Sequence, residues 1–471
     1  MKTTVIRSSW MAEYSHRLDC MPYVGGALET KLLIQGLKNT VPLLSLTKGV
    51  DGGIYNGPQF VRNYLESREH GVPFMTGSTM QLADLSNLPL LSKRDAHSAK
   101  LSYLEIQPGM TLISCSGSIG KMAYARREMK GVWSSQDVLK VVADPDKIES
   151  GYLYAYLSSI FGVPLLVSGT YGSIIQHLEA HQIADLPVPR FGDALEHEIH
   201  KLVEQAAELR SQATNQINTA KNLLLSDSGH PPKFGTRIAG DIVSQASSSD
   251  TITAKRFDPW FFNAKAVATD QWVRSHPWGY CKLGEVANAY NTSPFKRAYV
   301  SDTEHGVGFF GSADIFKVDR TPESFISRVA TKNVDEYLLP EGAVLLASSG
   351  SLGGVIGRPQ FVDSAMAGQA ASNHVMRIAC TGDSVPSGFL FAYLSTLEIG
   401  YPLLLRTATG DAIPEVWPVF VNQIPVLRAP AKLANQVDQM VREAFEDRVK
   451  ATAQETEARA RLEAALKAST Q

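Results

Sequence analysis

The sequence has few cysteines, and no two of them lie close together. Its four cysteines are Cys20, Cys115, Cys281 and Cys380, and none forms a C-x-x-C pair. Structural zinc sites and disulfide frameworks need closely spaced cysteines, so both are disfavoured. Isolated reduced thiols are instead typical of a cytoplasmic protein.

Long apolar runs are also missing. No stretch approaches the roughly 20 apolar residues that span a bilayer. The segment Met1–Trp10 lacks the apolar run of a signal peptide. We therefore expect a cytoplasmic protein with no membrane contact.

The sequence has no excess of basic charge. Lysine and arginine number 45 against 47 aspartate and glutamate, which gives a formal net charge of -2. A nucleic-acid binder usually has a basic imbalance, so any DNA contact must come from local clusters. The apolar content of 44% is that of a globular protein, and 471 residues predict two or more domains.

What the sequence does contain is an internal repeat. The segment Arg62–Val72 returns as Arg297–Val307, with Arg, Tyr, Glu, His, Gly and Val at the same places. Further pairs follow in the same order: Arg17–Asp19 with Arg256–Asp258, Phe74 with Phe309, Gly109 with Gly342, Ser116–Gly120 with Ser349–Gly353, Gly151–Ser158 with Gly388–Ser395, Gly162–Leu166 with Gly400–Leu404, and Leu186–Val188 with Ile424–Val426. The segment Cys20–Thr40 of the first copy has no evident match in the second. The repeat predicts two copies of one domain.

Each copy ends in a segment with helical periodicity. Apolar residues recur at alternating steps of three and four, which is the a/d spacing of a helix–helix seam. We assign the seam to Leu195, Ile199, Leu202, Ala206 and Leu209 in the first segment and to Val437, Met440, Ala444 and Leu462 in the second. The alternative is that each helix packs only on its own domain. A helix of about 30 residues is roughly 45 Å long, more than that packing needs, so we favour an antiparallel coiled coil.

The expected fold class is α/β, with two duplicated mixed α/β domains at residues 1–191 and 251–429. Short β-branched and aromatic runs are punctuated by glycine and interrupted by helical stretches, as in such domains. Long helices are predicted at residues 192–226 and 430–468. Residues 227–250 are rich in Ser, Gly and Pro and are predicted to be a linker.

Motifs for catalysis or nucleotide binding are not formed. The turn Ser116–Lys121 resembles a phosphate loop, but Cys115 replaces the first glycine and Met122 follows the lysine. A tight glycine turn after a strand is favoured over a loop whose amides approach DNA phosphates. His70 and His305 occupy matched positions and are assigned to structural turns rather than to a metal or acid–base pair. We expect no catalytic residue and no metal site.

Basic residues gather at two places in each copy. Arginine and lysine neutralise phosphates and bond guanine edges, which makes such clusters candidates for DNA contact. The candidates are Arg62, Lys121, Arg126, Arg127 and Lys130 in the first copy and Lys296, Arg297 and Arg358 in the second. The alternative for each cluster is an ordinary solvated face.

The order of these motifs, repeated twice with a long helix after each copy, resembles the specificity subunit of type I restriction–modification systems. The resemblance covers nearly the whole chain and is carried by Arg17–Asp19 and Arg256–Asp258, Gly109–Gly120 and Gly342–Gly353, Gly151–Ser158 and Gly388–Ser395, and Leu186–Pro189 and Ile424–Val426. Gly109–Gly120 and Gly342–Gly353 are similar to the family's strand and SxGxxG turn.

The resemblance implies a division of labour between subunits. Each α/β domain would be a target-recognition domain that reads one half of a split sequence in double-stranded DNA. The paired helices would separate the half-sites and dock adenine methyltransferase subunits, expected to be two. This chain would hold no cofactor. S-adenosylmethionine, and ATP and Mg²⁺ where a restriction or translocase subunit is present, would belong to the partners. A related defence system with another effector could use the same reader.

Two other functions stay open at this stage. A self-contained DNA-modifying enzyme would need an Asn/Asp-Pro-Pro-aromatic motif and a glycine-rich S-adenosylmethionine loop, and Asp258–Trp260 is the nearest approach. A helical scaffold that joins proteins without DNA contact would need only the helices. Gel shift on random duplex and a measurement of S-adenosylmethionine binding separate the three functions.

Overall fold

The computed structural model describes residues 26–168, 177–232, 246–301, 303–352, 354–382, 384–410 and 413–469, together with Val5, Arg7, Ser8, Met11, Tyr23 and Ser244. The repeat element Arg17–Asp19 and much of the predicted linker lie outside the described residues. The chain divides into two compact units. Unit 1 consists of Met1–Gln81, Leu88–Ser211 and Lys450–Gln471, and unit 2 consists of Leu82–Asn87 and Gln212–Val449.

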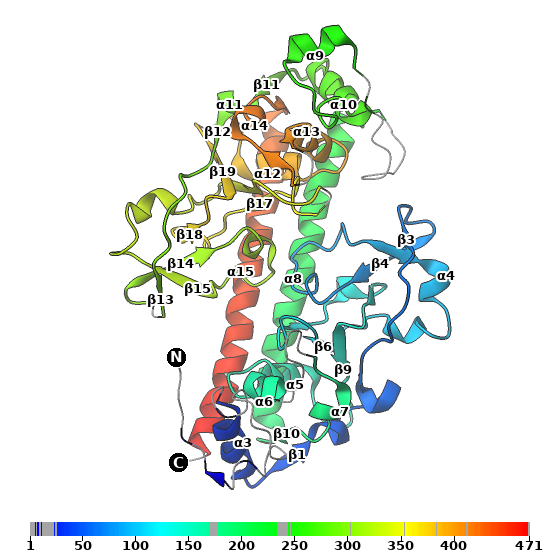
Figure 1. The fold of residues 1–471 in the computed structure, drawn as a ribbon, viewed down its shortest axis with the longest axis vertical. Helices are drawn as coiled ribbons and strands as arrows, with labels where there is room; N and C mark the ends of the chain where they lie inside the picture. Colours follow the sequence, from blue (N-terminus) through cyan, green and yellow to red (C-terminus); the bar gives the residue numbers. More distant parts are fainter. Residues whose placement is uncertain are drawn as a thin grey trace. The chain divides into compact units, whose positions relative to one another are not determined.

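The described strands of unit 1 form three small sheets (Figure 1). The first pairs β1 (Thr40–Pro42) with β10 (Pro187–Pro189). The second has the order β2 (Ile54–Tyr55), β9 (Val138–Val141), β6 (Thr111–Ser114), β7 (Met122–Tyr124). The third has the order β3 (Tyr64–Leu65), β5 (Leu90–Ser92), β4 (Gly71–Met75), β8 (Trp133–Ser134), in which only β4 and β8 are parallel.

Unit 2 repeats this topology strand for strand. Its first sheet pairs β11 (Tyr280–Lys282) with β22 (Pro425–Leu427). The second has the order β12 (Ala287–Tyr290), β19 (Val375–Cys380), β16 (Val344–Ala347), β17 (Gln360–Phe361). The third has the order β13 (Tyr299–Val300), β15 (Ser324–Ser327), β14 (Gly306–Phe310), β18 (Ala370–Ala371), again with one parallel pair, β14 and β18. A further pair joins β20 (Ala408–Thr409) to β21 (Glu415–Val416).

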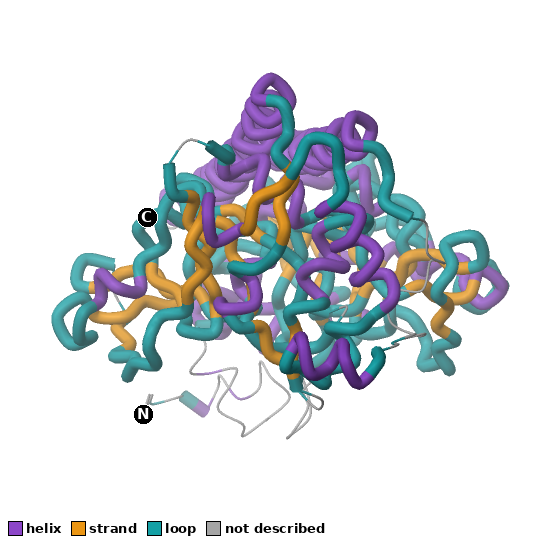
Figure 2. Tube along the Cα trace, turned by 90° about the horizontal axis from the view of Figure 1, so that it is seen from above, coloured by secondary structure: helices purple, strands orange, loops and turns teal. Residues whose placement is uncertain are grey.

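Short helices lie among the strands (Figure 2). Unit 1 contains α3 (Ala27–Gln35), η1 (Leu43–Leu46), η2 (Val50–Gly53), α4 (Lys93–Ala96), η3 (Ser102–Leu104), η4 (Arg127–Met129), α5 (Ser150–Leu157), α6 (Gly162–Ser168) and α7 (Ala180–Ile183). Unit 2 contains α9 (Ser248–Ala254), α10 (Ala264–Arg274), α11 (Leu283–Val286), η5 (Asp314–Phe316), η6 (Val334–Tyr337), α12 (Ser387–Leu394), α13 (Gly400–Leu405) and α14 (Pro418–Val421).

The structure supplies the match that the sequence of Cys20–Thr40 does not show. Helix α3 contacts α6 and β10, and helix α10 contacts α13 and β22, which are the equivalent elements of unit 2. The two helices therefore occupy the same place in the two copies, although their sequences have diverged.

Two glycines are required where α5 and α12 begin against the long helices. The amide of Gly151 donates to His200 Nδ1 at 3.1 Å, and the amide of Gly388 donates to Asp438 Oδ1 at 2.6 Å. A Cβ atom at either glycine would lie 2.7 Å from the same side chain and about as close to backbone atoms. Only glycine allows this approach, which explains why it recurs in both copies.

The long helices are α8 (Asp193–Ser228) and α15 (Ala431–Ala468), and each unit contains a piece of both. In unit 1, Arg461 donates to Glu198, and Gln454 Nε2 donates to Gln205 Oε1 at 3.3 Å. In unit 2, Gln216 Nε2 donates to Glu443 Oε2 at 2.8 Å. Residue numbers rise along α8 as they fall along α15, so the pieces run antiparallel. The predicted mixed α/β duplication and antiparallel helices are confirmed.

Buried residues alternate by three and four along both helices, which is the spacing of a coiled-coil seam. On α8 they are Ile199, Val203, Ala206, Arg210, Ala213, Ile217, Ala220 and Leu224. On α15 they are Val437, Val441, Ala444, Arg448, Ala451, Glu455, Ala458 and Leu462. Two arginines and a glutamate thus occupy interior positions.

The seam predicted from apolar residues is partly displaced from this one. Buried members of the prediction are Ile199, Ala206, Val437, Ala444 and Leu462. Half-buried members are Leu195, Leu202, Leu209 and Met440. Their inward neighbours include Val203, Arg210 and Val441. Leu195 and Leu202 pack on the core of unit 1, and Met440 packs on the core of unit 2.

Candidate nucleic-acid interface

The most similar basic sites of the two copies lie beside the third sheets. Arg62 precedes β3, and its guanidinium carbon lies 5.6 Å from the centre of the Phe74 ring. Arg297 precedes β13, and its guanidinium carbon lies 5.0 Å from the centre of the Phe309 ring. Each arginine therefore rests on the equivalent phenylalanine of its own copy, in a cation–π contact that orients the side chain.

A second contact fixes each guanidinium. Arg62 Nη2 donates to Gln136 Oε1 at 2.9 Å and lies 3.6 Å from Asp137 Oδ2. Arg297 Nη2 donates to Ser372 Oγ at 3.1 Å. Gln136 and Asp137 come shortly after β8, and Ser372 comes directly after the equivalent strand β18. Arg297 and its neighbour Lys296 are exposed, and Arg62 is half-buried. The structure thus places Arg62 and Arg297 at matching positions, with Lys296 beside Arg297.

Sequence reasoning missed further exposed cations on the same sheets. Lys93 follows β5 and Arg328 follows β15, and both side chains are exposed. The amide of Lys93 donates to the carbonyl of His70 at 2.8 Å, and the amide of Arg328 donates to that of His305 at 3.0 Å. The matched histidines therefore lie in equivalent turns that place a cation at each sheet. The repeat could have found them, because Lys93 and Arg328 follow matched serines.

The hairpin arginines of unit 1 are turned toward α8. Arg126 is 2% exposed and its Nε donates to Glu128 Oε1 at 2.6 Å. Glu128 in turn accepts from Ser211 Oγ of α8 at 2.5 Å. Arg127 Nη1 lies 3.3 Å from Glu208 Oε2 of α8. This contact network attaches the hairpin to the long helix, and the buried Arg126 guanidinium does not reach the surface.

The remaining candidates of the hairpin region lie in different surroundings. Lys121 is half-buried in the glycine turn between β6 and β7, and Lys130 is exposed. Arg358 is half-buried in unit 2, where its Nη2 donates to the carbonyl of Asn87 at 3.2 Å. Burial lowers the pKa of Arg358, although Asp84 opposes that effect. Arg358 therefore faces the interior of its unit.

Burial keeps the described cysteine thiols in a protonated, weakly nucleophilic form. Cys115 and Cys281 are buried and Cys380 is half-buried, and all three are free. Burial raises the pKa of Cys115 and of Cys380 to about 11, which keeps both thiols protonated at neutral pH. Within the described ranges, no group of three or more His, Cys, Asp or Glu residues is arranged to hold a metal ion.

Among the helices that the structure describes, none is both long and apolar enough to cross a bilayer alone. The bent pair α5 and α6 meets that test by length and composition only.

Comparison with known proteins gives structural matches only. Neither a protein-family model nor a curated protein matches the chain. The chain is similar to a type I restriction–modification S subunit from M. genitalium, with 12% identity over 90% of this chain and 93% of that one and a TM-score of 0.33. It is similar to the HsdS subunit from Thermoanaerobacter tengcongensis, with 14% identity, 91% and 95% coverage and a TM-score of 0.26.

A third solved structure concerns complex assembly and conformational transition of the type I R-M system. Its identity to this chain is 14%, its coverage is 92% of this chain and 96% of that one, and its TM-score is 0.29. All three matches come from the family that the sequence resembles. Because the identities and TM-scores are low, function has to be argued from the geometry of the chain itself.

Proposed function

We propose that this chain is the non-catalytic specificity subunit of a type I restriction–modification complex or of a related methylation-based defence complex. It reads a bipartite sequence in double-stranded DNA. The observation that carries the proposal is the strand-for-strand repeat of three sheets, with a long helix after each copy and antiparallel pairing of the two helices.

This architecture suits a split DNA target. Two equivalent helices that run antiparallel have the directions of a twofold-related pair, and duplex DNA has an approximate dyad. Half-sites one helical turn apart are separated by about 34 Å, within the length of such helices. In the proposal, residues 1–191 and 251–429 are the readers, residues 192–226 and 430–468 are the spacers, and residues 227–250 are the linker.

The DNA contacts are assigned to the cations that can reach solvent. Arg62 and Arg297 are oriented in advance by their phenylalanines and lead the contacts in the two copies. Lys121, Arg127, Lys130 and Lys296 are the other predicted members, and the Arg127 side chain stays 77% exposed beside Glu208. Arg126 and Arg358 instead hold parts of the fold together, as their bonds to Glu128 and Asn87 indicate.

The partners in this proposal are two adenine methyltransferase subunits docked on the paired helices, with restriction or translocase subunits in a complete complex. S-adenosylmethionine, ATP and Mg²⁺ are bound by those subunits in a cytoplasmic assembly. A direct check is S-adenosylmethionine binding by the isolated chain, which we expect to be negligible.

The decisive experiment exchanges one reader. Residues 1–191 are replaced by the corresponding part of a related chain, and methylated bases are mapped in a host that expresses the complete complex. We expect one half of the methylated sequence to change and the other half to stay. A change in both halves, or in neither, would contradict the assignment of one half-site to each copy.

A further inference from the structure

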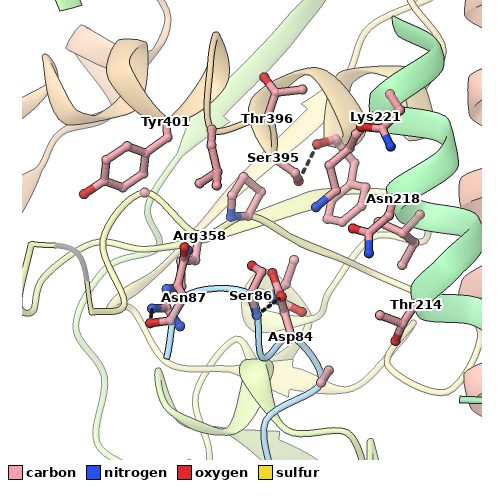
Figure 3. A pocket seen from close by; sticks show the side chains of 18 of the residues that line it. Asp84, Ser86, Asn87, Thr214, Asn218, Lys221, Arg358, Ser395, Thr396 and Tyr401 are labelled. Atoms are coloured by element: carbon pink, nitrogen blue, oxygen red, sulfur yellow. Dashed lines mark hydrogen bonds between the residues drawn. The ribbon is translucent and has the colours of Figure 1, made fainter. Parts of the chain in front are cut away.

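Unit 2 contains a polar cavity of about 330 Å³ at the seam side of α8 (Figure 3). Its charged lining residues are the cations Lys221, Arg358 and Arg448 and the carboxylates Asp84 and Glu398. Asn218 and Lys221 extend from α8 toward the cavity, and Asp84 enters from the opposite side on the segment Leu82–Asn87 (Figure 3). Cavities of this size and polarity are large enough for a small ligand.

The equivalent place in unit 1 is filled by a buried ion pair. Arg210 Nη2 of α8 lies 2.6 Å from Glu455 Oε2 of α15, and both side chains are about 5% exposed. Tyr154 also hydrogen bonds Glu455, and Arg459 lies close enough to stabilise its charge. The Glu455 carboxylate therefore interacts with two cations, Arg210 and Arg459, and with the phenol of Tyr154.

The repeat shows what has changed in unit 2. The constant offset between α8 and α15 matches Arg448 to Arg210 and Lys221 to Arg459. Ile217 takes the position of Glu455. Unit 2 has therefore kept both cations of the cluster and replaced the carboxylate between them by an apolar side chain, which lines the cavity together with them.

The phenol is replaced in the same way. The matched segments Gly151–Ser158 and Gly388–Ser395 place Phe391 where unit 1 has Tyr154. Phe391 also lines the cavity. Unit 2 has thus lost both oxygen-bearing groups that face the cations in unit 1, and a cavity stands in their place.

Lys221 is the clearest sign of a missing anion. Among the described residues, its ammonium group makes no hydrogen bond and no ion pair within 4 Å. Burial lowers the pKa of Lys221 and Arg448 adds to that effect, whereas the carboxylates of Asp84 and Glu398 oppose it. Asp84 is also engaged elsewhere, since it accepts the amide of Ser86 at 2.8 Å and interacts with Arg358. A half-buried cation without a close partner is less stable than a paired one, and a bound anion would offset that cost.

We propose that the unit 2 cavity binds a small oxyanion, a phosphate or carboxylate group, which lies between Lys221 and Arg448 and serves there as the Glu455 carboxylate serves in unit 1. The ligand reaches three elements at once, namely α8, α15 and the segment Leu82–Asn87. Its binding stabilises the folded chain by mass action and needs no DNA.

The test is thermal unfolding of the full chain during titration with inorganic phosphate, and separately with acetate, at an ionic strength held constant with chloride. We expect phosphate or acetate to raise Tm by about 2–5 °C in a saturable manner, and the more effective anion identifies the group that is bound. If neither anion raises Tm above the chloride control, the proposal is wrong.

Substitutions separate this site from general anion effects. Ile217→Glu restores the carboxylate of unit 1, so Tm should rise in chloride alone and the response to the anions should be lost. Lys221→Met should also lose the response. Asn215→Glu adds the same charge on the exposed face of α8 and should respond as the wild type does. A full response in Ile217→Glu would overturn the proposal, and neither result bears on DNA reading.

Discussion

Helix α5 of unit 1 and helix α12 of unit 2 make matching contacts, whereas the side chains at the hairpins and along the long helices differ between the units. Tyr156 Oη of α5 donates to the carbonyl of Pro187 at 2.5 Å, and Tyr393 Oη of α12 donates to that of Pro425 at 2.8 Å. Each bond attaches the helix to the last strand of its copy. The contacts that assemble a copy have thus been retained after duplication.

The differences lie at the hairpins and at the helix seam. In unit 1 the hairpin after the glycine turn carries Arg127 and Lys130 at its surface, whereas Arg358 of unit 2 faces the interior. In unit 1 the seam contains Glu455, and unit 2 has Ile217 in its place. A common framework with different surface cations is what two readers of different half-sites require, because base readout depends on individual side chains.

The largest effect should come from the seam of unit 1. Glu455→Ala leaves Arg210 buried without its carboxylate, and removal of one partner from a buried pair costs about 3–5 kcal/mol. Urea unfolding measures this loss. The double variant Arg210→Met, Glu455→Leu should recover most of the stability, and failure to recover would show that packing rather than charge is lost.

The next largest effect concerns the affinity of the assembled complex for DNA. Arg62→Ala and Arg297→Ala should each weaken binding of the assembled complex to its target by about 1–3 kcal/mol if the residue contacts a base. Fluorescence anisotropy on targets with one altered half-site would show which half each arginine serves. Lys432→Ala, at an exposed position on α15, is the matched loss of charge and should leave affinity unchanged. Equal losses on every duplex would indicate phosphate contacts only.

A pH effect distinguishes the second sheets of the two units. Lys140 in β9 and Arg377 in β19 are equivalent and fully buried. Burial lowers the pKa of Lys140 to about 7, whereas that of Arg377 is lowered only to about 10. Between pH 7 and 10 the unfolded lysine holds a proton that the folded lysine has lost, so the free energy of unfolding should rise with pH, by at most about 1.4 kcal/mol per pH unit.

Denaturant unfolding across this pH range measures the slope for the wild type and for Lys140→Met. The variant should lose the rise, and Arg377→Met should keep it. A slope that is unchanged in Lys140→Met would assign the proton to another group.

The smallest effect concerns the tyrosine–proline hydrogen bond that each unit makes at an equivalent position. Tyr156→Phe and Tyr393→Phe each remove a buried hydrogen bond and leave a proline carbonyl without its donor, which costs about 1–2 kcal/mol. Thermal unfolding should show similar losses for both. Clearly unequal losses would mean that the two units do not depend equally on this contact.

The sequence predicted the duplication and both long helices because these features are local or repeated. Identical residues at one offset survive in turns and at close approaches such as Gly151 and Gly388, where few residues fit. The a/d spacing of the long helices is likewise visible in one dimension.

Tertiary choices were not predictable in the same way. Arg210 and Glu455 look like surface residues in the sequence, yet they face each other in the seam, and this displaced the predicted seam at Leu202 and Leu209. Arg126 looked available for DNA because its burial, and the bond from Ser211 of α8 to its partner Glu128, arise only when the hairpin packs on α8. The equivalence of α3 and α10 depends on position in the fold, since their sequences no longer agree.

The way in which α8 and α15 are divided between the units has a genetic consequence. The core of unit 1 includes Ala458, Leu462 and Leu466 of α15. These residues lie about 270 residues or more after β10, the last described strand of that unit, a separation longer than a typical domain. A stop codon shortly after residue 430 would therefore damage the first unit as well as the second. Conversely, a gene cut within the linker would yield two fragments that each need the other, so their co-expression should restore the protein from two open reading frames.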